Sequence, residues 1–495
     1  MRSHGLVLDR LFANGQSQPA HPAVWKGDHA ISYGAFCRQV RTLAAELVRI
    51  AKEPRVLIHL PQGADAYAGM FATLAAGGVY APINLESPLT KQRAILQEFE
   101  PHVVISTAEL YAKLCVDGGA APLVDVHVDR SDELGSSKPP HRLAYVMFTS
   151  GSTGKPKGVM IPRIALQHYA DWAVEAMPVT PQDRWSQHPN IAFDVSVLDI
   201  FGALCGGATL FPINSAMDRL MPAMSIKRHA LTIWNSVPSV VNLMVQSGQM
   251  TRDNLESLRL ITFCGEALLP EHLEAIFSVR PDIPVHNTYG PTETTVSVTL
   301  LRVDASNYRG AVSHTVALGD PIGDMDVFID GGGDTGEILI SGPQLADGYW
   351  GEANARAGAV FTERVIDGVP RRVYRTGDLG QRIGRNLYFK SRLDNQTKIK
   401  GFRLELDEVN GAMRRCGLQN AVSAVVEGTL HAFIESDRAL DIEALRKGLA
   451  QWLEPHAIPT EFHFVAMLPR NDNDKIDIKA LARGLGESRS GASAG

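Results

Sequence analysis

The chain has 495 residues, of which 45% are hydrophobic and 21% are charged. This composition is ordinary for a globular protein, and the length corresponds to about three folding units of about 150 residues each. Lysine and arginine number 48 against 54 aspartate and glutamate, and the net charge of −6 argues against a general nucleic-acid binder. Five scattered cysteines without a Cys-x-x-Cys pair argue against a disulfide framework or a structural zinc site and favour a reducing compartment.

The N-terminal residues carry charges too early for a secretory leader, and the most apolar window, 70–82, is shorter than the about 20 residues that cross a bilayer. We therefore expect a soluble, cytoplasmic protein.

Short β-branched runs alternate with helical patterns over the first half of the chain. Strands are predicted over 56–60, 103–106, 143–148 and 258–263, and a helix over 64–77. This alternation is typical of βαβ units and predicts an α/β protein with a mainly parallel sheet.

The pattern changes after residue 312, where short strands are separated by glycine and aspartate, which favours antiparallel hairpins. These strands are predicted over 327–330, 336–341 and 387–389. A small α+β domain is expected next, with helices over 405–416 and 441–454 and strands over 421–426 and 430–434. The polar end of the chain predicts a flexible tail.

A loop rich in glycine, hydroxyl groups and lysine follows the strand at 143–148. It contains Thr149, Ser150, Gly151, Ser152, Thr153, Gly154 and Lys155, followed by Pro156, Lys157 and Gly158. Glycines let a backbone approach an anion, and hydroxyls and lysines supply donors and charge, so we interpret the segment as a phosphate-binding loop. Pro156 stands where a Walker A motif needs its second glycine. The structural alternative is an ordinary surface loop.

Two further clusters contain groups that suit a nucleotide. In the segment 287–293, Tyr289 offers a face for base stacking, and Glu293 is a hard oxygen ligand of the kind Mg²⁺ prefers. In the segment 374–379, Asp378 follows a glycine and is well placed to accept hydrogen bonds from ribose hydroxyls. Each segment alone is also consistent with a structural turn.

Taken in order, these segments resemble the adenylate-forming enzyme superfamily, which includes acyl-CoA ligases, luciferases and the amino-acid-adenylating domains of nonribosomal peptide synthetases. The similarity runs from about Ile31 to Asp477 and includes the stretches 74–82, 348–350 and 392–403. It implies a large N-terminal domain, 1–393, of two layered βαβ subdomains plus a β-barrel-like part. It also implies a small mobile C-terminal lid over 394–483, with its hinge at Asp394, and leaves 484–495 as the tail.

The resemblance assigns catalytic roles to Lys475, Glu293 and Thr149. The lysine would bridge the substrate carboxylate and the α-phosphate, and Glu293 would hold Mg²⁺. Two residues depart from the family pattern, because Asp474 and Ser391 both stand where the family has glycine. The alternative for Lys475 is a solvated C-terminal lysine. The expected ATP-binding residues are Thr149, Ser150, Gly151, Ser152, Thr153, Gly154, Lys155, Gly265, Glu266, Asn287, Thr288, Tyr289, Gly290, Thr292, Asp378, Arg392 and Lys475.

The branch within the superfamily depends on Asp194. In amino-acid-activating members an aspartate at this position binds the substrate ammonium, and a buried ammonium needs such a partner because an unpaired buried charge is strongly destabilising. The alternative is a helix N-cap before 195–204. The other expected pocket residues are small or medium in size, without formal charge except for Lys475: Val195, Leu198, Asn235, Thr262, Cys264, Thr288, Val296 and Ser297.

The runs 263–266 and 287–289 look most like those of free-standing D-alanine–carrier protein ligases. The resemblance therefore implies ATP- and Mg²⁺-dependent activation of a small neutral amino acid, alanine first, with serine, threonine or cysteine as alternatives. The acceptor would be the phosphopantetheine thiol of a separate acyl or peptidyl carrier protein, with no nucleic-acid or membrane partner. Two other functions stay open, an acid–CoA ligase for a small carboxylic acid and a catalytically silent nucleotide sensor or scaffold.

Overall fold

The computed structural model consists of two compact units. The larger unit comprises Met1–Leu85, Ile95–Phe148 and Lys157–Leu393, and the smaller one comprises Glu86–Ala94, Thr149–Pro156 and Asp394–Gly495. The structure describes residues 7–115, 121–125, 141–149, 156–366, 368–393, 396–399, 402–426, 428–436, 438–469, 480–481 and 485.

A nine-stranded sheet forms the centre of the larger unit, with parallel strands from β13 to β1 and antiparallel strands at both edges. Its order is β15 (Asp320–Pro321), β14 (Thr299–Val303), β13 (Val285–Tyr289), β12 (Leu260–Phe263), β11 (Ile233–Ser236), β9 (Arg184–Gln187), β10 (Thr209–Pro212), β1 (Pro22–Lys26) and β2 (His29–Ser32). The mainly parallel arrangement confirms the prediction from the alternating pattern.

A seven-stranded sheet is the second layer of the larger unit. Its order is β18 (Gly348–Tyr349), β8 (Lys157–Pro162), β7 (Leu143–Thr149), β4 (Val79–Pro82), β3 (Arg55–His59), β5 (Val103–Ser106) and β6 (Leu123–Asp125). The predicted helix over 64–77 is α3 (Ala64–Ala75). The strands predicted in this region are all present, within one or two residues of their expected bounds.

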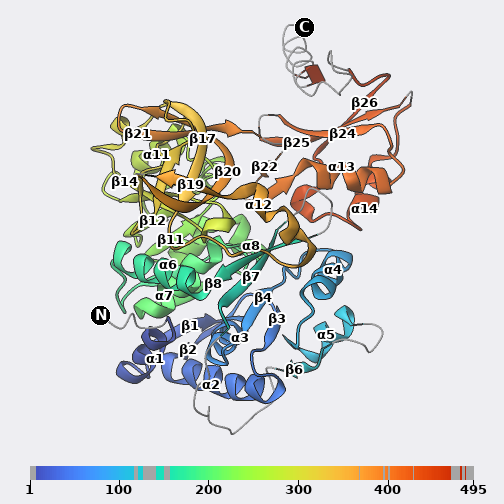
Figure 1. Cartoon of the computed structure of the whole chain (residues 1–495). Helices are drawn as coiled ribbons and strands as arrows, with labels where there is room; N and C mark the ends of the chain where they lie inside the picture. The colour runs from blue at the N-terminus through green and yellow to red at the C-terminus, as the bar shows by residue number, and fades with distance from the viewer. Residues whose placement is uncertain are drawn as a thin grey trace. The chain divides into compact units, whose positions relative to one another are not determined.

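Two helices at the sheets carry residues of the candidate site. Figure 1 shows α6 (Arg163–Ala176) and α7 (Val195–Gly206) side by side. Almost every residue of α7 is apolar, which is typical of a helix that is buried all round, and the helix ends at Gly207, whose φ of 87° is left-handed. Further helices of eight or more residues are α1 (Val7–Ser17), α2 (Tyr33–Ile50), α4 (Leu89–Phe99), α9 (Pro222–His229), α10 (Ser239–Gln246) and α11 (Pro270–Val279). The shorter ones are α5 (Ala108–Leu114), α8 (Ala216–Leu220) and α12 (Ala357–Val360).

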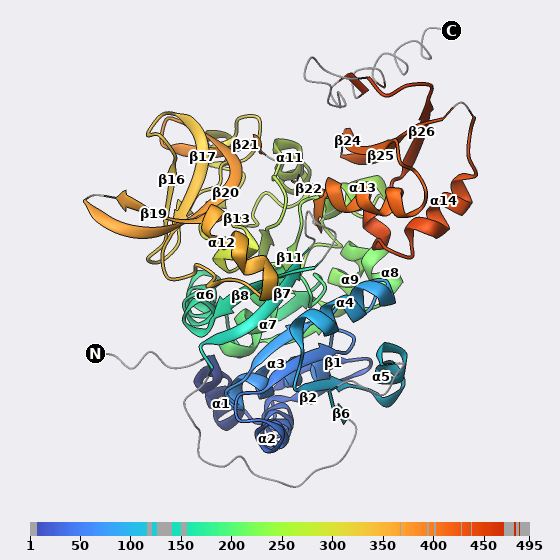
Figure 2. The same ribbon diagram turned by 45° about the vertical axis from the view of Figure 1, so that its right-hand side comes forward.

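An antiparallel sheet completes the larger unit and confirms the hairpins predicted after residue 312. It consists of β16 (Asp326–Ile329), β17 (Thr335–Ser341), β20 (Val369–Ile383) and β19 (Phe361–Ile366), with β21 (Asn386–Arg392) paired to β20. Figure 2 shows these strands strongly curved. This curvature accounts for the barrel-like part expected from the sequence.

The smaller unit has an α+β fold, as predicted. Its three-stranded sheet contains β24 (Ala421–Val426), β25 (Thr429–Glu435) and β26 (Glu461–Val465). It also contains α13 (Leu406–Arg415), α14 (Ile442–Leu449) and the pair β22 (Gln396–Ile399) and β23 (Phe402–Glu405). The helix expected over 441–454 ends at Leu449, ahead of Pro455. Of the predicted tail over 484–495, the structure describes Leu485 alone.

Among the described residues, no helix is both long and apolar enough to cross a bilayer.

Candidate active site

The strand order of the nine-stranded sheet reverses at β9. From β9 the chain passes through α7 to β10 on one side, and later returns to β11 on the other side of β9. In open α/β sheets, ligands bind beyond the carboxyl ends of the strands at such a point. Asp194 lies in the connection after β9, and Asn235 lies near the carboxyl end of β11. The fold therefore places these two predicted pocket residues where a ligand site is expected.

Strands β11 and β12 present polar side chains to one face of the sheet. Asn235 is paired in register with Thr262, and both side chains are buried. Because side chains alternate along a strand, Trp234 and Ile261 point to the opposite face, where they join an apolar core. The alternation leaves Asn235 and Thr262 on the face that α7 covers, since Asn235 contacts a residue of that helix.

Asp199, on α7, is fully buried and fixes the orientation of Asn235. Its Oδ1 atom accepts hydrogen bonds from Trp185 Nε1 at 3.0 Å and from Asn235 Nδ2 at 2.8 Å. The indole can only donate, so Oδ1 is an acceptor and the Asn235 atom facing it is the amide nitrogen. Burial raises the pKa of Asp199 well above its usual range, against the effect of these two hydrogen bonds.

Four buried polar atoms in this region have no hydrogen-bond partner among the described residues. They are Tyr145 Oη, Asp199 Oδ2, Asn235 Oδ1 and Thr262 Oγ1. A buried polar group without a partner is destabilising, and such groups are rare in folded proteins. Three of them belong to α7, β11 and β12, and Tyr145 comes from β7 of the other sheet, where it lies near enough to Asp194 for that charge to act on it. Their grouping indicates a place where a polar ligand completes the hydrogen bonds.

Asp194 stands at the N-cap position of α7, but its side chain makes no capping hydrogen bond. The structure thus disfavours the alternative in which this carboxylate serves only to start the helix. Burial raises the pKa of Tyr145 and of Tyr169, and the negative charge of Asp194 raises both pKa values further. Both phenols therefore stay protonated and are available as donors.

Tyr169, on α6, connects several predicted pocket residues. Its hydroxyl lies 3.0 Å from Ser297 Oγ. Besides burial, Cys264, Asp194 and Asp199 all act to raise the pKa of Tyr169. The Cys264 thiol faces the carbonyl of Val296 at 3.9 Å. Leu198 and Val296 belong to the same apolar core as Tyr169, and Val195 is also buried.

A second group joins three predicted nucleotide-binding residues. Tyr289 Oη donates to Asp378 Oδ2 at 2.7 Å, and Arg392 Nη1 lies 2.5 Å from Asp378 Oδ1. Asp378 and Arg392 are directly paired between β20 and β21, which explains their approach. Arg392 also donates to the carbonyl of Thr376 at 3.2 Å. The sequence placed these three residues at the nucleoside, and the structure brings them together.

Glu293 is fully buried in the short helix η1 (Thr292–Thr294). Its Oε1 accepts from Tyr349 Oη at 3.0 Å and lies 3.4 Å from Lys157 Nζ. Among the described residues, no three histidine, cysteine or acidic side chains form a metal cluster. A single carboxylate fits Mg²⁺ that arrives with a nucleotide, because Mg²⁺ commonly takes one or two carboxylates and completes its shell with phosphates and water.

The other expected ATP-binding residues of the larger unit have structural contacts of their own. Asn287 Nδ2 donates to the carbonyl of Ala317 at 2.8 Å, and Thr288 Oγ1 donates to that of Phe263 at 2.9 Å. Glu266 Oε2 accepts from the backbone of Ser239 at 3.0 Å. The backbone requires glycine at two of these positions: Gly265 has a φ of 96°, and a Cβ on Gly290 would lie 2.6 Å from the Cα of Ser297. Thr292 is buried.

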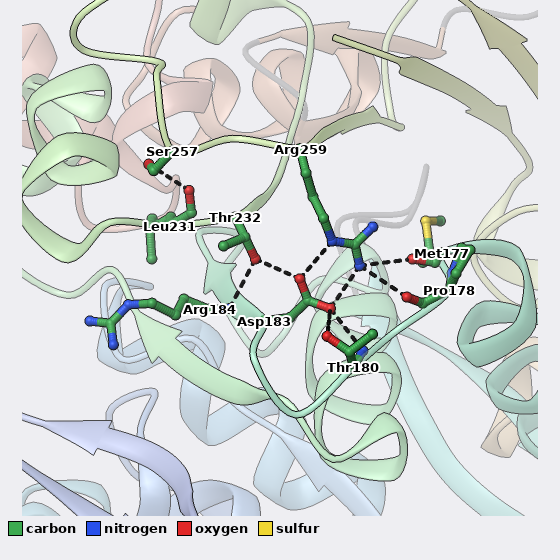
Figure 3. Close-up of polar contacts among 9 residues, drawn as sticks. All are labelled: Met177, Pro178, Thr180, Asp183, Arg184, Leu231, Thr232, Ser257 and Arg259. Atoms are coloured by element: carbon green, nitrogen blue, oxygen red, sulfur yellow. Dashed lines mark hydrogen bonds and ion pairs between the residues drawn. The ribbon is translucent and has the colours of Figure 1, made fainter.

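A polar network pins the amino ends of the same strands (Figure 3). Asp183, just before β9, accepts two hydrogen bonds from Arg259, at 2.6 and 2.7 Å, and one from Thr232 at 2.7 Å. Thr180 adds two more, from its backbone and its hydroxyl. Burial alone would raise the pKa of Asp183, but these donors outweigh it and leave the pKa below its usual value.

Several predicted site residues lie outside the described residues, and their roles stay predictions. They are Ser150, Gly151, Ser152, Thr153, Gly154, Lys155, Asp394 and Lys475, together with the departure at Asp474. Thr149 is described and is the last residue of β7. Ser391, the other departure, pairs with Leu379 in the antiparallel sheet.

The sequence analysis missed Asp199, Tyr145, Tyr169 and the contact between Lys157 and Glu293. Asp199 had a signal, because it is a lone carboxylate in an otherwise apolar helix. The two tyrosines had none, since they come from separate elements that only the tertiary fold brings to Asp194.

Fold and site together define an adenylate-forming α/β enzyme with a small α+β domain. A family model described as AMP-binding enzyme matches residues 11–350, and the chain belongs to this family.

Relatives over nearly the whole chain include enzymes that load amino acids onto carrier proteins. An L-proline–[L-prolyl-carrier protein] ligase of Streptomyces coelicolor is 30% identical, covering 95% of this chain and 95% of its own. A D-alanine–D-alanyl carrier protein ligase of Bacillus velezensis is 28% identical, covering 96% and 98%. Among solved structures, the adenylation domain AlmE of Vibrio cholerae, in complex with glycyl-adenosine-5'-phosphate, is 27% identical with a TM-score of 0.84, covering 97% and 98%.

Proposed function

We propose that this enzyme activates a small neutral amino acid as its aminoacyl-adenylate and then transfers it to the phosphopantetheine thiol of a separate carrier protein. Relatives of nearly the same length carry out carrier-protein ligation with proline or D-alanine, and the similar AlmE structure holds a glycyl adenylate. Proline, D-alanine and glycine are all small amino acids, and this agrees with a pocket formed by small and medium side chains.

The observation that carries the proposal is the Asp194 carboxylate. It does not cap its helix, and it lies where its charge acts on two buried phenols. An amino-acid ammonium is the substrate group whose charge complements this carboxylate, and pairing of the two charges offsets the cost of taking them out of water. The substrate of an acid–CoA ligase has no such group for Asp194 to bind.

In the proposed adenylation, an oxygen of the amino-acid carboxylate attacks the α-phosphorus of ATP as the bond to pyrophosphate breaks. Asp194 holds the ammonium, Asp378 with Arg392 holds the ribose, and Tyr289 lies beside the adenine, so the reacting atoms are aligned. Lys475 stabilises the charge that develops on the α-phosphate, and the loop after Thr149 holds the β- and γ-phosphates. Bound at Glu293, Mg²⁺ would supply charge neutralisation at the phosphates.

The thioester step would follow rotation of the small domain, 394–483, against the large domain, 1–393, about Asp394. Such lid motions are a common way to exchange one set of reacting groups for another. The thiol of the carrier loses its proton and its sulfur attacks the acyl carbon. The C–S bond forms as the bond between the acyl carbon and the phosphate oxygen breaks, and AMP leaves with the electrons of that bond.

Alanine is the first proposed substrate because the expected pocket residues are small or medium in size, and because the second acidic group, Asp199, is bonded through Oδ1 to Trp185 and Asn235. Serine is the second candidate, since the free Asn235 Oδ1 and Thr262 Oγ1 would accept from its hydroxyl. Threonine and cysteine are further members of the same class.

ATP–pyrophosphate exchange tests the proposal. The panel contains glycine, both enantiomers of alanine and serine, threonine, cysteine and proline, with propionate as the alanine analogue without its amine. Exchange with a small amino acid but not with propionate is expected. Exchange with propionate as strong as with alanine would support the acid–CoA ligase, and no exchange with any acid would support the silent nucleotide sensor.

A further inference from the structure

The segment that connects Glu293 to the pocket has an unusual backbone. Thr295 and Val296 have φ angles of 59° and 71°, in the left-handed region. Both are β-branched, and such residues adopt this region only when the surrounding structure holds them there. The strained pair separates Glu293, the expected Mg²⁺ ligand, from Ser297, which contacts Tyr169. Whatever holds this segment therefore sets the positions of both.

The side chain of Gln344 holds this segment. This residue follows β17 and is fully buried. Its Nε2 donates to the carbonyls of Ser297 at 2.9 Å, Thr294 at 3.1 Å and Thr295 at 3.4 Å. In return, the hydroxyl of Thr295 donates to the backbone carbonyl of Gln344 at 2.8 Å. One amide group thus binds three carbonyls across the strained turn.

His168 orients this amide. Its Nδ1 lies 2.8 Å from Gln344 Oε1, and its Nε2 faces the backbone N–H of Asp324 at 3.4 Å. Because the Gln344 nitrogen is committed to carbonyls, its oxygen must accept, so His168 Nδ1 carries the proton and Nε2 is the acceptor. With a fixed tautomer, His168 prevents the carboxamide from turning over and placing its oxygen against the three carbonyls.

Helix α6, which carries His168, also contacts the far end of the segment, at Ser297. His168 and Tyr169 are adjacent on it, and they contact Gln344 and Ser297 respectively. A second contact from the loop after β17 holds the near end, since the backbone N–H of Ala346 donates to the Glu293 carbonyl at 2.8 Å. The segment 293–297 is therefore held between α6 and the loop that contains Gln344.

We propose that Gln344, aligned by His168, is a positioning residue that holds the strained turn 294–297 and thereby sets the wall of the amino-acid pocket formed by Val296 and Ser297. Neither residue touches the substrate in this account. They act through the backbone that presents Val296, Ser297 and Glu293. The effect on catalysis rests on the proposed function, whereas the effect on the turn does not.

Hydrogen–deuterium exchange tests the structural half. Gln344→Leu keeps the side-chain size but removes the three hydrogen bonds, and we expect amides of a peptide covering 290–298 to exchange about tenfold faster. His168→Phe should act in the same direction with a smaller effect, and it serves if Gln344→Leu does not fold. Gln249→Leu is the control, because Gln249 is also buried and its Nε2 faces a backbone carbonyl, that of Leu220, away from the site.

Pyrophosphate exchange tests the catalytic half. For Gln344→Leu we expect KM for the amino acid to rise about tenfold while KM for ATP stays within about twofold, because Asp378 lies outside the turn and Glu293 keeps its own contacts with Tyr349 and the Ala346 N–H. Gln249→Leu should change neither KM. The inference is wrong if Gln344→Leu and His168→Phe lower only the melting temperature, as the control does, and if the amides of 290–298 exchange with deuterium as fast as in the parent. If the parent shows no amino-acid-dependent pyrophosphate exchange, the proposed function fails. The deuterium measurement then still decides whether Gln344 holds the turn.

Discussion

Replacing Asp194 by asparagine removes one charge from the site and keeps the shape of the side chain. Breaking a buried ion pair by removing one partner costs about 3–5 kcal/mol. Asp194 is half-buried, so we take the lower end, about 3 kcal/mol, which corresponds to a loss of about a hundredfold in kcat/KM at about 1.4 kcal/mol per factor of ten. The expected loss applies to alanine and not to propionate, because propionate has no ammonium for Asp194 to bind.

The measurement is the ratio of exchange rates with alanine and propionate, in the parent and in Asp194→Asn. The ratio should fall by about the same hundredfold. Asp183→Asn is a matched control, since Asp183 is a buried aspartate of the same unit that lies at the opposite end of the strands. An Asp194→Asn enzyme that activates alanine within about threefold of the parent would refute the assignment of this carboxylate to the ammonium.

Three further outcomes are expected. Asp378→Asn should raise KM for ATP about tenfold with little change in KM for the amino acid, because its carboxylate is assigned to the ribose; equal effects on both would contradict this. Asn235→Leu should lower exchange with serine about tenfold relative to alanine, and an unchanged ratio would exclude a hydroxyl contact at Asn235. Asp183→Asn should lower the melting temperature at pH 7 by removing a buried partner of Arg259. Because the folded-state pKa of Asp183 is lowered, its stabilisation is present above the unfolded value of about 4 and is lost as the pH falls through the folded value. The difference in melting temperature between parent and variant should therefore shrink in acid, and a constant difference would contradict the sign.

The layout of both units was predictable because their strands are short apolar runs bounded by glycine, proline or charge. The strands at 103–106 and 421–426 have the predicted bounds. The helix predicted over 441–454 was too long, because the chain leaves the helix at Leu449, and Pro455 accounts only for the non-helical backbone of Glu454. Local sequence features of this kind determine most of the fold.

The sequence could nominate site residues only where one residue carries a chemical group that the proposed reaction needs, as at Asp194, Glu293 and Asp378. The supporting residues depend on pairs that are far apart in the chain. Asp199 reaches Asn235 across 36 residues, and His168 reaches Gln344 across 176. No periodicity in the sequence encodes such contacts, because they depend on how α6 and α7 pack against the sheets.

The strands β9, β11 and β12 carry the Asp183 network at one end and the pocket side chains at the other. Each strand is only four residues long, and the two ends use different side chains. Engineers who wish to change the proposed amino-acid preference can therefore vary Asn235, Thr262 and Cys264 as a set and leave the Asp183 network intact.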